Sequence, residues 1–225
     1  MLNFFKEVFK KGELRRKVVF TLGILFVFRL GAGIVIPYID TSAITSAATS
    51  SGIFGIMNML GGGTLEKFSL FSLGVSPYIT SSIIIELLSM DVVPALTQWN
   101  KEGNTGKKKK DKVTRVLTLA LAIIQGGSLT YAFDKGYSIL ASSSIWTYVY
   151  VVVVMAAGSM FTMWLGDQIT IKGVGNGTSL LIFTGIVANL PNSFISSFKS
   201  MVTFGSTYKT ATSLAWYILF VLVYL

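Results

Sequence analysis

The sequence predicts an all-α integral membrane protein, and three features of its composition support this fold class. Apolar residue types make up 52% of the 225 residues and only 13% are charged, about half the charged fraction of an average soluble domain. Long stretches carry no charge, and the net charge of +9 is concentrated in two tracts beside apolar segments. This distribution fits anionic lipid headgroups and membrane topology better than a nucleic-acid surface.

Residues 1–17 are expected to form a cytoplasmic amphipathic segment that lies along the membrane surface. Six basic residues are mixed with apolar residues spaced to share one helical face: Phe4, Phe5, Val8 and Phe9. A cleavable signal peptide is the alternative interpretation. It is disfavoured because no small-x-small cleavage site follows at a suitable distance and the next apolar run contains Arg29.

Five apolar segments are expected to be complete spans, since a span needs about 20 apolar residues, or fewer where neighbouring helices shelter it. They cover residues 18–36, 71–88, 116–133, 145–165 and 178–190. The fifth has only thirteen residues and is followed by Pro191, so we expect other helices to enclose it. Residues 18–190 would therefore form one five-helix unit.

The remaining residues, 191–225, are expected to form an outer linker followed by the start of a sixth span near residue 211. The chain ends inside this uninterrupted apolar run. We therefore expect the sequence to be the N-terminal fragment of a longer protein.

The distribution of Lys and Arg predicts the orientation of the chain in the membrane. With the N-terminus in the cytoplasm, the cytoplasmic segments carry fourteen basic residues: six in 1–17, seven in 101–115, and Lys172. The opposite side carries four: Lys67, Lys135, Lys199 and Lys209. This positive-inside bias predicts a multi-pass cell-membrane protein with a cytoplasmic N-terminus and an outer stretch at 37–70.

The outer stretch contains an unusual apolar segment at residues 52–60. Nine residues of helix reach about 14 Å, too little to cross a hydrocarbon core of about 30 Å. Two interpretations are open: an interfacial helix on the outer surface, or a re-entrant segment that fills a cavity in the protein. Three glycines at 61–63 would supply flexible backbone after it.

The composition also excludes several classes of chemistry within this chain. The sequence contains no histidine and no cysteine, which removes imidazole and thiolate metal ligands, Ser-His-Asp triads and disulfides. Neither a paired-aspartate nor a Ser-His arrangement of an intramembrane protease is present. We therefore expect no catalytic residues, no bound metal and no cofactor in this chain.

Three blocks of sequence carry a resemblance to a known family. They are FSLGVSPYIT at 71–80 running into SIIIELL at 82–88, EG at 102–103 with Gly106 and a basic run ending at Arg115, and MWLGDQIT at 163–170 with GVGNG at 173–177. FRLG at 28–31 supports them. In these motifs and their order, the chain resembles SecY, the channel subunit of the bacterial Sec translocon.

The resemblance implies the first half of a ten-helix channel built from two five-helix halves. An hourglass pore would lie between the halves, with a lateral gate towards lipid. The segment 52–60 occupies the position of the family's plug, which blocks the outer funnel of the resting pore. Its apolar residues would be the plug contacts: Ile53, Phe54, Ile56, Met57, Met59 and Leu60.

The resemblance also implies functional positions. The aliphatic pore ring would include Val75, Ile79, Thr178 and Ile182 from this half, although Thr178 departs from the usual isoleucine. Without the motifs, ordinary helix packing would be the better interpretation of these residues. Lateral-gate positions would be Glu86, Gln125 and Asn176, and Glu86 stands where the family usually has glutamine. A carboxylate in a span is costly, so Glu86 would either reach water at the cytoplasmic end or set the polarity of the gate.

A basic cytoplasmic loop is expected to contain Lys107, Lys108, Lys109, Lys110 and Arg115. Its charges act mainly as a topology signal, and clustered cations of this kind can also contact polyanions such as ribosomal RNA.

The resemblance implies a pore-forming subunit that passes unfolded secretory polypeptides and releases membrane helices sideways into the bilayer. Its partners would be SecE, SecG, the SecA motor, the ribosome, signal-sequence-bearing polypeptides and membrane lipids, with no small-molecule substrate. Two alternatives stay open: an accessory SecY paralogue for few clients, and a secondary transporter. Charged groups within the spans are limited to Arg29 and Glu86, which argues against proton or cation coupling.

Single-cysteine labelling tests the topology, because the chain contains no cysteine of its own. In the full-length protein, we expect Lys108→Cys and Ser142→Cys to react with an impermeant thiol reagent from opposite faces of the membrane. Reaction of both positions from one shared face would overturn the predicted number of spans.

Overall fold

The computed structural model describes residues 12–40, 64, 65, 67–90, 92–140 and 144–188. In these ranges the chain forms six helices and only isolated β-bridges: α2 (Gly12–Ala32), α5 (Ser76–Leu88), α6 (Pro94–Lys101), α7 (Asn104–Tyr137), α8 (Ile145–Lys172) and the helix Gly177–Ala188. The predicted all-α class is confirmed for this part of the chain. The predicted plug at 52–60, residues 1–11 of the surface segment, and the linker with the sixth span lie outside the described residues.

Two of the described helices are long and apolar enough to cross a membrane by length and composition: α7 over Asn104–Gly136, and α8. With 34 and 28 residues and a rise of about 1.5 Å per residue, α7 and α8 extend about 51 Å and 42 Å. Both exceed the hydrocarbon thickness of about 30 Å. The 21 residues of α2 would reach about 32 Å, but this helix also carries four basic residues: Arg15, Arg16, Lys17 and Arg29.

The helix of the predicted second span is shorter than expected. Residues 71–75 form turns, and α5 begins only at Ser76. The boundary has a local cause, since Gly74 adopts a φ of +52° and Pro77 lies in the first helical turn, where its missing N–H leaves no bond unmade. The 13 residues of α5 extend about 20 Å, so this helix alone does not cross a bilayer.

The predicted basic loop is also different in the structure. Residues 107–110 and Arg115 lie in the first turns of α7, which begins twelve residues before the predicted span at Val116. Lysine is a good helix former, and the positive φ of Gly103 (+63°) lets the chain reverse directly from α6 into α7. Gly106 completes this hairpin, because a Cβ atom there would lie 1.8 Å from the Trp99 carbonyl oxygen.

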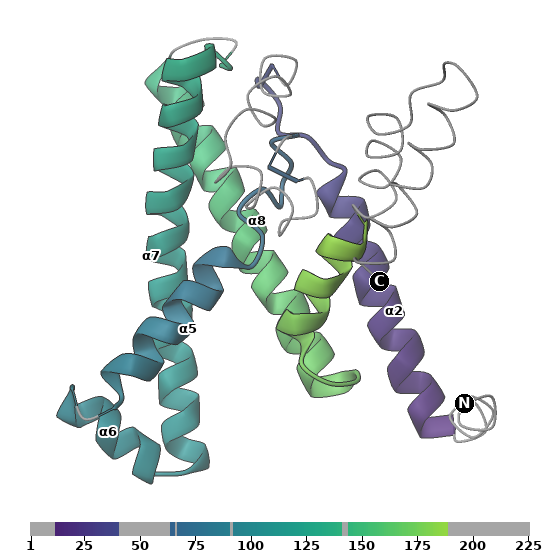
Figure 1. The fold of residues 1–225 in the computed structure, drawn as a ribbon, viewed down its shortest axis with the longest axis vertical. Helices are drawn as coiled ribbons and strands as arrows, with labels where there is room; N and C mark the ends of the chain where they lie inside the picture. Colours follow the sequence, from purple (N-terminus) through teal and green to yellow (C-terminus); the bar gives the residue numbers. More distant parts are fainter. Residues whose placement is uncertain (1–11, 41–63, 66, 91, 141–143, 189–225) are drawn as a thin grey trace, which may run out of the picture.

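Figure 1 shows how the helices are arranged. The long helices α7 and α8 lie together in the upper part of the view and diverge towards the bottom, and α5 crosses α7 in its lower half. Helix 177–188 lies between α8 and α2, and α6 packs on the lower end of α7. The two short apolar helices, α5 and helix 177–188, therefore lie on opposite sides of α8 in the same half of the molecule.

The apolar core has two parts. One lies between α7 and α8 and includes Phe68, Phe133 and Met155. The other joins α2, the segment before α5, α8 and helix 177–188, and includes Phe28 and Phe71. Their rings stack with centroids 5.6 Å apart. At Gly31, in contact with this pair, a Cβ atom would lie 2.2 Å from the Phe71 ring.

The segment before α5 crosses α8 at very short range. A Cβ atom on Gly158 of α8 would lie only 1.8 Å from the Leu70 carbonyl oxygen. The neighbouring Ser159 is 1% exposed and donates a hydrogen bond of 3.1 Å from its hydroxyl to the Gly74 carbonyl. These two contacts fix the position along α8 at which the chain enters α5.

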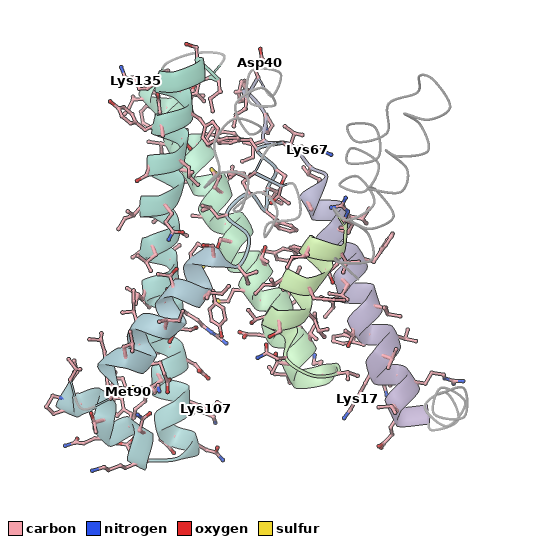
Figure 2. The ribbon with its side chains drawn as sticks, viewed as in Figure 1. Lys17, Asp40, Lys67, Met90, Lys107 and Lys135 are labelled. Carbon is pink, nitrogen blue, oxygen red and sulfur yellow. The ribbon has the colours of Figure 1, made fainter. Side chains whose placement is uncertain are left out.

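Segments that the sequence places on the same side of the membrane lie at the same end of the molecule. Figure 2 places Lys17, Met90 and Lys107 at one end, and Asp40 and Lys135 at the other. We call these the inner and outer ends, after the predicted cytoplasmic and external sides. At the outer end the chain after α2 pairs with the chain after α7, with the Asp40 amide donating to the Ile139 carbonyl at 2.8 Å.

Glycine at position 158 is required by the crossing, so Gly158→Ala should destabilise the full-length protein. We expect its free energy of unfolding in detergent to fall by about 1–3 kcal/mol, the usual cost of overpacking. Gly127→Ala on α7 is the matched control, since the nearest atom to its Cβ would be 3.9 Å away. The free energy of unfolding of the control should rise by up to about 1 kcal/mol, because alanine has a higher helix propensity than glycine. Equal stabilisation of both variants would contradict the crossing.

Candidate functional site

An apolar cavity of about 270 Å³ is lined by residues of α2, α5, helix 177–188 and the segment before α5. Three of the four residues predicted for the pore ring line it: Val75, Ile79 and Ile182. Val75 is 8% exposed and the other two side chains are half-buried. The rest of the lining contains no charged residue: Phe28, Ser72, Leu73, Gly74, Ser76, Thr80 and Leu181.

The same three residues also pack into the core. Val75 is a buried member of the cluster that contains Phe28 and Phe71, and Ile79 and Ile182 pack against that cluster. Burial alone therefore fits both interpretations made from the sequence, a pore ring and ordinary helix packing. What the structure adds is that the three aliphatic residues line one shared cavity, Val75 and Ile79 from the start of α5 and Ile182 from helix 177–188.

The α5 wall of the cavity follows from the turn that precedes the helix. Val75 is the residue immediately before α5, and its carbonyl accepts a hydrogen bond of 3.0 Å from the Ile79 amide. Residues four apart lie on one face of a helix. The turn at Gly74 and the first turn of α5 therefore place the side chains of Val75 and Ile79 on the same side.

The opposite wall comes from helix 177–188, which begins against α8. A Cβ atom on Gly177 would lie 2.0 Å from the Gly166 carbonyl oxygen, so glycine is required at this contact. Ile182 then faces the apolar cavity from the second turn. Thr178, one turn earlier, lines a different cavity. The predicted inclusion of Thr178 in the ring is thus not supported by a shared cavity in the described structure.

A second, polar cavity of about 390 Å³ opens nearer the inner end. It is lined by residues of α5, α7, α8 and the start of helix 177–188, including Glu86 and Asn176, two of the three predicted gate residues. The remaining charged lining is mixed in sign: Lys107, Lys110, Asp111, Arg115 and Asp167. The third predicted gate residue, Gln125, is half-buried on α7 and lines neither of these two cavities.

Lys110 is the centre of the polar contacts at the inner end. Its ammonium donates to Glu86 Oε2 and Asn100 Oδ1 at 3.0 Å each, and to Ser89 Oγ at 3.2 Å. The Lys110 side chain is 16% exposed, whereas that of Glu86 is 60% exposed. One lysine thus connects the end of α5, α6 and α7, and Glu86 lies exposed at the inner end.

Two further ion pairs brace the inner end. Arg115 of α7 contacts Asp167 of α8 at 2.8 Å, and Lys109 contacts Glu102 at 2.8 Å. Exposed pairs of this kind contribute at most about 1 kcal/mol each. Sequence reasoning missed Asp167 and Asn100 as partners, because both contacts join segments that are brought together only by the packing of α5, α6 and α8 on α7.

Within the described ranges, no group of three or more acidic side chains is arranged to hold a metal ion. The predicted plug residues fall at 52–60, outside these ranges. The site that the described structure presents is therefore an apolar cavity between two short helices, adjoined by a polar cavity at the inner end.

Comparison with known proteins identifies the family. The SecY family model matches residues 69–225, more than half of the chain. The chain belongs to the SecY family. It is 41% identical over 212 residues to protein translocase subunit SecY of Bacillus subtilis, covering 93% of this chain and 47% of that protein. The SecY subunit of Staphylococcus aureus is 40% identical over 222 residues, with coverages of 96% and 50%.

The fold likewise matches solved members of this group. Sec61 in the canine ribosome-channel complex from the endoplasmic reticulum superposes with a TM-score of 0.56 at 18% identity, covering 89% of this chain and 41% of that chain. A second structure, of a protein-conducting channel, gives the same values. The chain therefore has a SecY-like fold and spans about half the length of the curated relatives it matches.

Because Lys110 makes three hydrogen bonds, we expect its loss to lower the stability of the protein more than the loss of Lys109. In the full-length protein, Lys110→Met should lower the free energy of unfolding by about 1–3 kcal/mol, since the Lys110 side chain is mostly buried and its removal leaves the buried Ser89 hydroxyl without this donor. Lys109→Met is the matched control, and should cost about 0–1 kcal/mol because its pair with Glu102 is exposed. Thermal unfolding in detergent measures both. Equal losses would contradict the central role of Lys110.

Proposed function

We propose that this chain is the N-terminal half of the pore-forming subunit of a protein-conducting channel. The channel would pass unfolded secretory polypeptides across the cell membrane and release membrane-protein helices laterally into it. The observation that carries the proposal is the shared apolar cavity, which is lined by Val75 just before α5, by Ile79 of α5 and by Ile182 of helix 177–188. Membership of the SecY family supports it.

The chemistry of the cavity suits this task. A narrow aliphatic constriction dewets, so it presents a barrier to hydrated ions while the pore is idle. The same side chains lack hydrogen-bonding and charged groups, so they do not hold a passing polypeptide strongly. The adjoining polar cavity would keep the inner approach hydrated, since it is lined by charged residues of both signs. In this proposal the second half of the channel supplies the remaining wall.

The other parts of the proposal follow from the sequence. The N-terminus would be cytoplasmic, five spans would make up this half, and residues 52–60 would form the plug. Residues 1–17 would form the amphipathic segment at the inner membrane surface, although the last six of them, 12–17, are already part of α2. Glu86 and Asn176 would border the lateral gate from the polar cavity, with Gln125 on α7 as a further gate position.

The partners of the complete subunit would be SecE, SecG, the SecA motor, the ribosome and signal-sequence-bearing polypeptides. The motor or the ribosome would supply the work, so the channel itself needs no enzymatic activity or cofactor. Lys107, Lys108 and Lys109 are exposed at the inner end of α7, where clustered cations could contact ribosomal RNA phosphates. A restricted, accessory client range is compatible with the same geometry and differs only in which polypeptides are passed.

Charge placed in the constriction should open it to ions. In the full-length channel, Ile79→Asp and Ile182→Asp should each raise resting ion conductance in planar bilayers several-fold, because a hydrated carboxylate wets an apolar ring. Ile79→Leu and Ile182→Leu are the matched controls, and should leave conductance unchanged because size and polarity barely change. Ordinary core packing predicts a different result: loss of folded protein with Asp, and normal conductance in the fraction that survives.

A further inference from the structure

The hydroxyl of Thr21 joins α2 to a segment 153 residues further along the chain. Thr21 is 7% exposed, and its Oγ1 donates to the Lys17 carbonyl at 2.9 Å. The same oxygen accepts a hydrogen bond of 3.1 Å from the Val174 amide. A hydroxyl has one proton to donate and lone pairs to accept, so Thr21 satisfies the amide of the turn without leaving its own proton unpaired.

The turn that donates this hydrogen bond has little conformational freedom of its own. At Gly173, a Cβ atom would lie 2.5 Å from Thr21 Oγ1, so α2 and the turn are in direct contact. Gly175 adopts a φ of +74°, a conformation that favours glycine. The Gly177 amide then donates to Thr170 Oγ1 of α8 at 2.9 Å. The turn at residues 173–177 is thus held from α2 on one side and from α8 on the other.

The position of this turn sets the start of helix 177–188. Asn176 links the two, because its side-chain oxygen accepts from the Ser179 amide at 3.3 Å and its carbonyl accepts from the Leu180 amide at 3.1 Å. A shift of the turn would therefore be passed directly to the first turn of the helix. Ile182 follows one turn later and faces the apolar cavity.

A second contact lies on the same face of α2. Phe28 is seven residues, or two turns, beyond Thr21, so the two side chains share one face of the helix. Phe28 lines the apolar cavity together with Leu181 and Ile182. Helix 177–188 thus meets α2 through apolar side chains at the cavity, whereas the Thr21 hydroxyl provides a directional hydrogen bond at its start.

We propose that Thr21 is a positioning residue of the constriction: its hydrogen bond to Val174 fixes the start of helix 177–188 against α2 and thereby holds Ile182 at the apolar cavity. This inference rests on the proposed channel function. The α5 wall has a separate hydroxyl anchor, because Ser159 of α8 bonds the Gly74 carbonyl. Loss of the Thr21 bond should therefore affect the Ile182 side of the cavity selectively.

The test compares Thr21→Val with Thr21→Ser in the full-length channel. Valine matches threonine in shape but cannot bond the Val174 amide, whereas serine keeps the hydroxyl. Hydrogen–deuterium exchange of peptides spanning 171–176 should be at least about tenfold faster at the Val174 amide in the valine variant, as expected when an amide loses its hydrogen-bond acceptor. The serine variant should retain the parent rate. Unchanged exchange in the valine variant would overturn the inference.

Resting ion conductance in planar bilayers then tests the consequence, with Ile182→Asp measured beside both variants. We expect Thr21→Val to raise conductance at least about twofold and Thr21→Ser to leave it at the parent level. If Ile182→Asp conducts and Thr21→Val does not, the positioning role is overturned while the proposed channel function stands. If neither conducts, the ring assignment of Ile182 fails and the positioning role fails with it.

Discussion

The close crossing of residues 70–74 over α8 is the constraint on which the described structure depends. The Leu70 carbonyl approaches Gly158 so closely that a Cβ atom there would lie 1.8 Å away, and Ser159 bonds the Gly74 carbonyl beside it. This crossing fixes the position along α8 at which the irregular segment ends and α5 begins. The position of the cavity lined by Val75 and Ile79 therefore depends on the close approach of this backbone to α8.

The two cavities divide the work that the proposed channel must do. The apolar cavity is built from short helices whose starts are fixed by backbone contacts of glycine: Gly158 for the α5 side, and Gly177 for helix 177–188. The polar cavity is built from α5, α7 and α8, and Lys110 ties its inner rim together through three hydrogen bonds. Charged side chains therefore line the polar cavity at the inner end and are absent from the lining of the apolar cavity, as a barrier to hydrated ions requires.

The sequence predicted the fold class well because composition and charge spacing are local signals. The helix boundaries were harder to predict. Gly74 and Pro77 are signals for the start of α5, but residues 71–75 are largely apolar and were therefore included in the predicted span. The basic run was assigned to a loop from its charge, although lysine favours helix and the run continues into α7. Asn100 and Asp167 could not be predicted as partners, because their contacts depend on tertiary packing between α6, α7 and α8.

The central claim is that the apolar cavity is part of the path of a translocating polypeptide. Site-specific photocrosslinkers at positions 79 and 182 of the full-length channel, with a stalled secretory chain engaged, test it most directly. The account predicts that both positions form adducts with the secretory chain, since both side chains line the cavity from different helices. Adducts only with lipid or with neighbouring helices, while the secretory chain is demonstrably engaged, would contradict it.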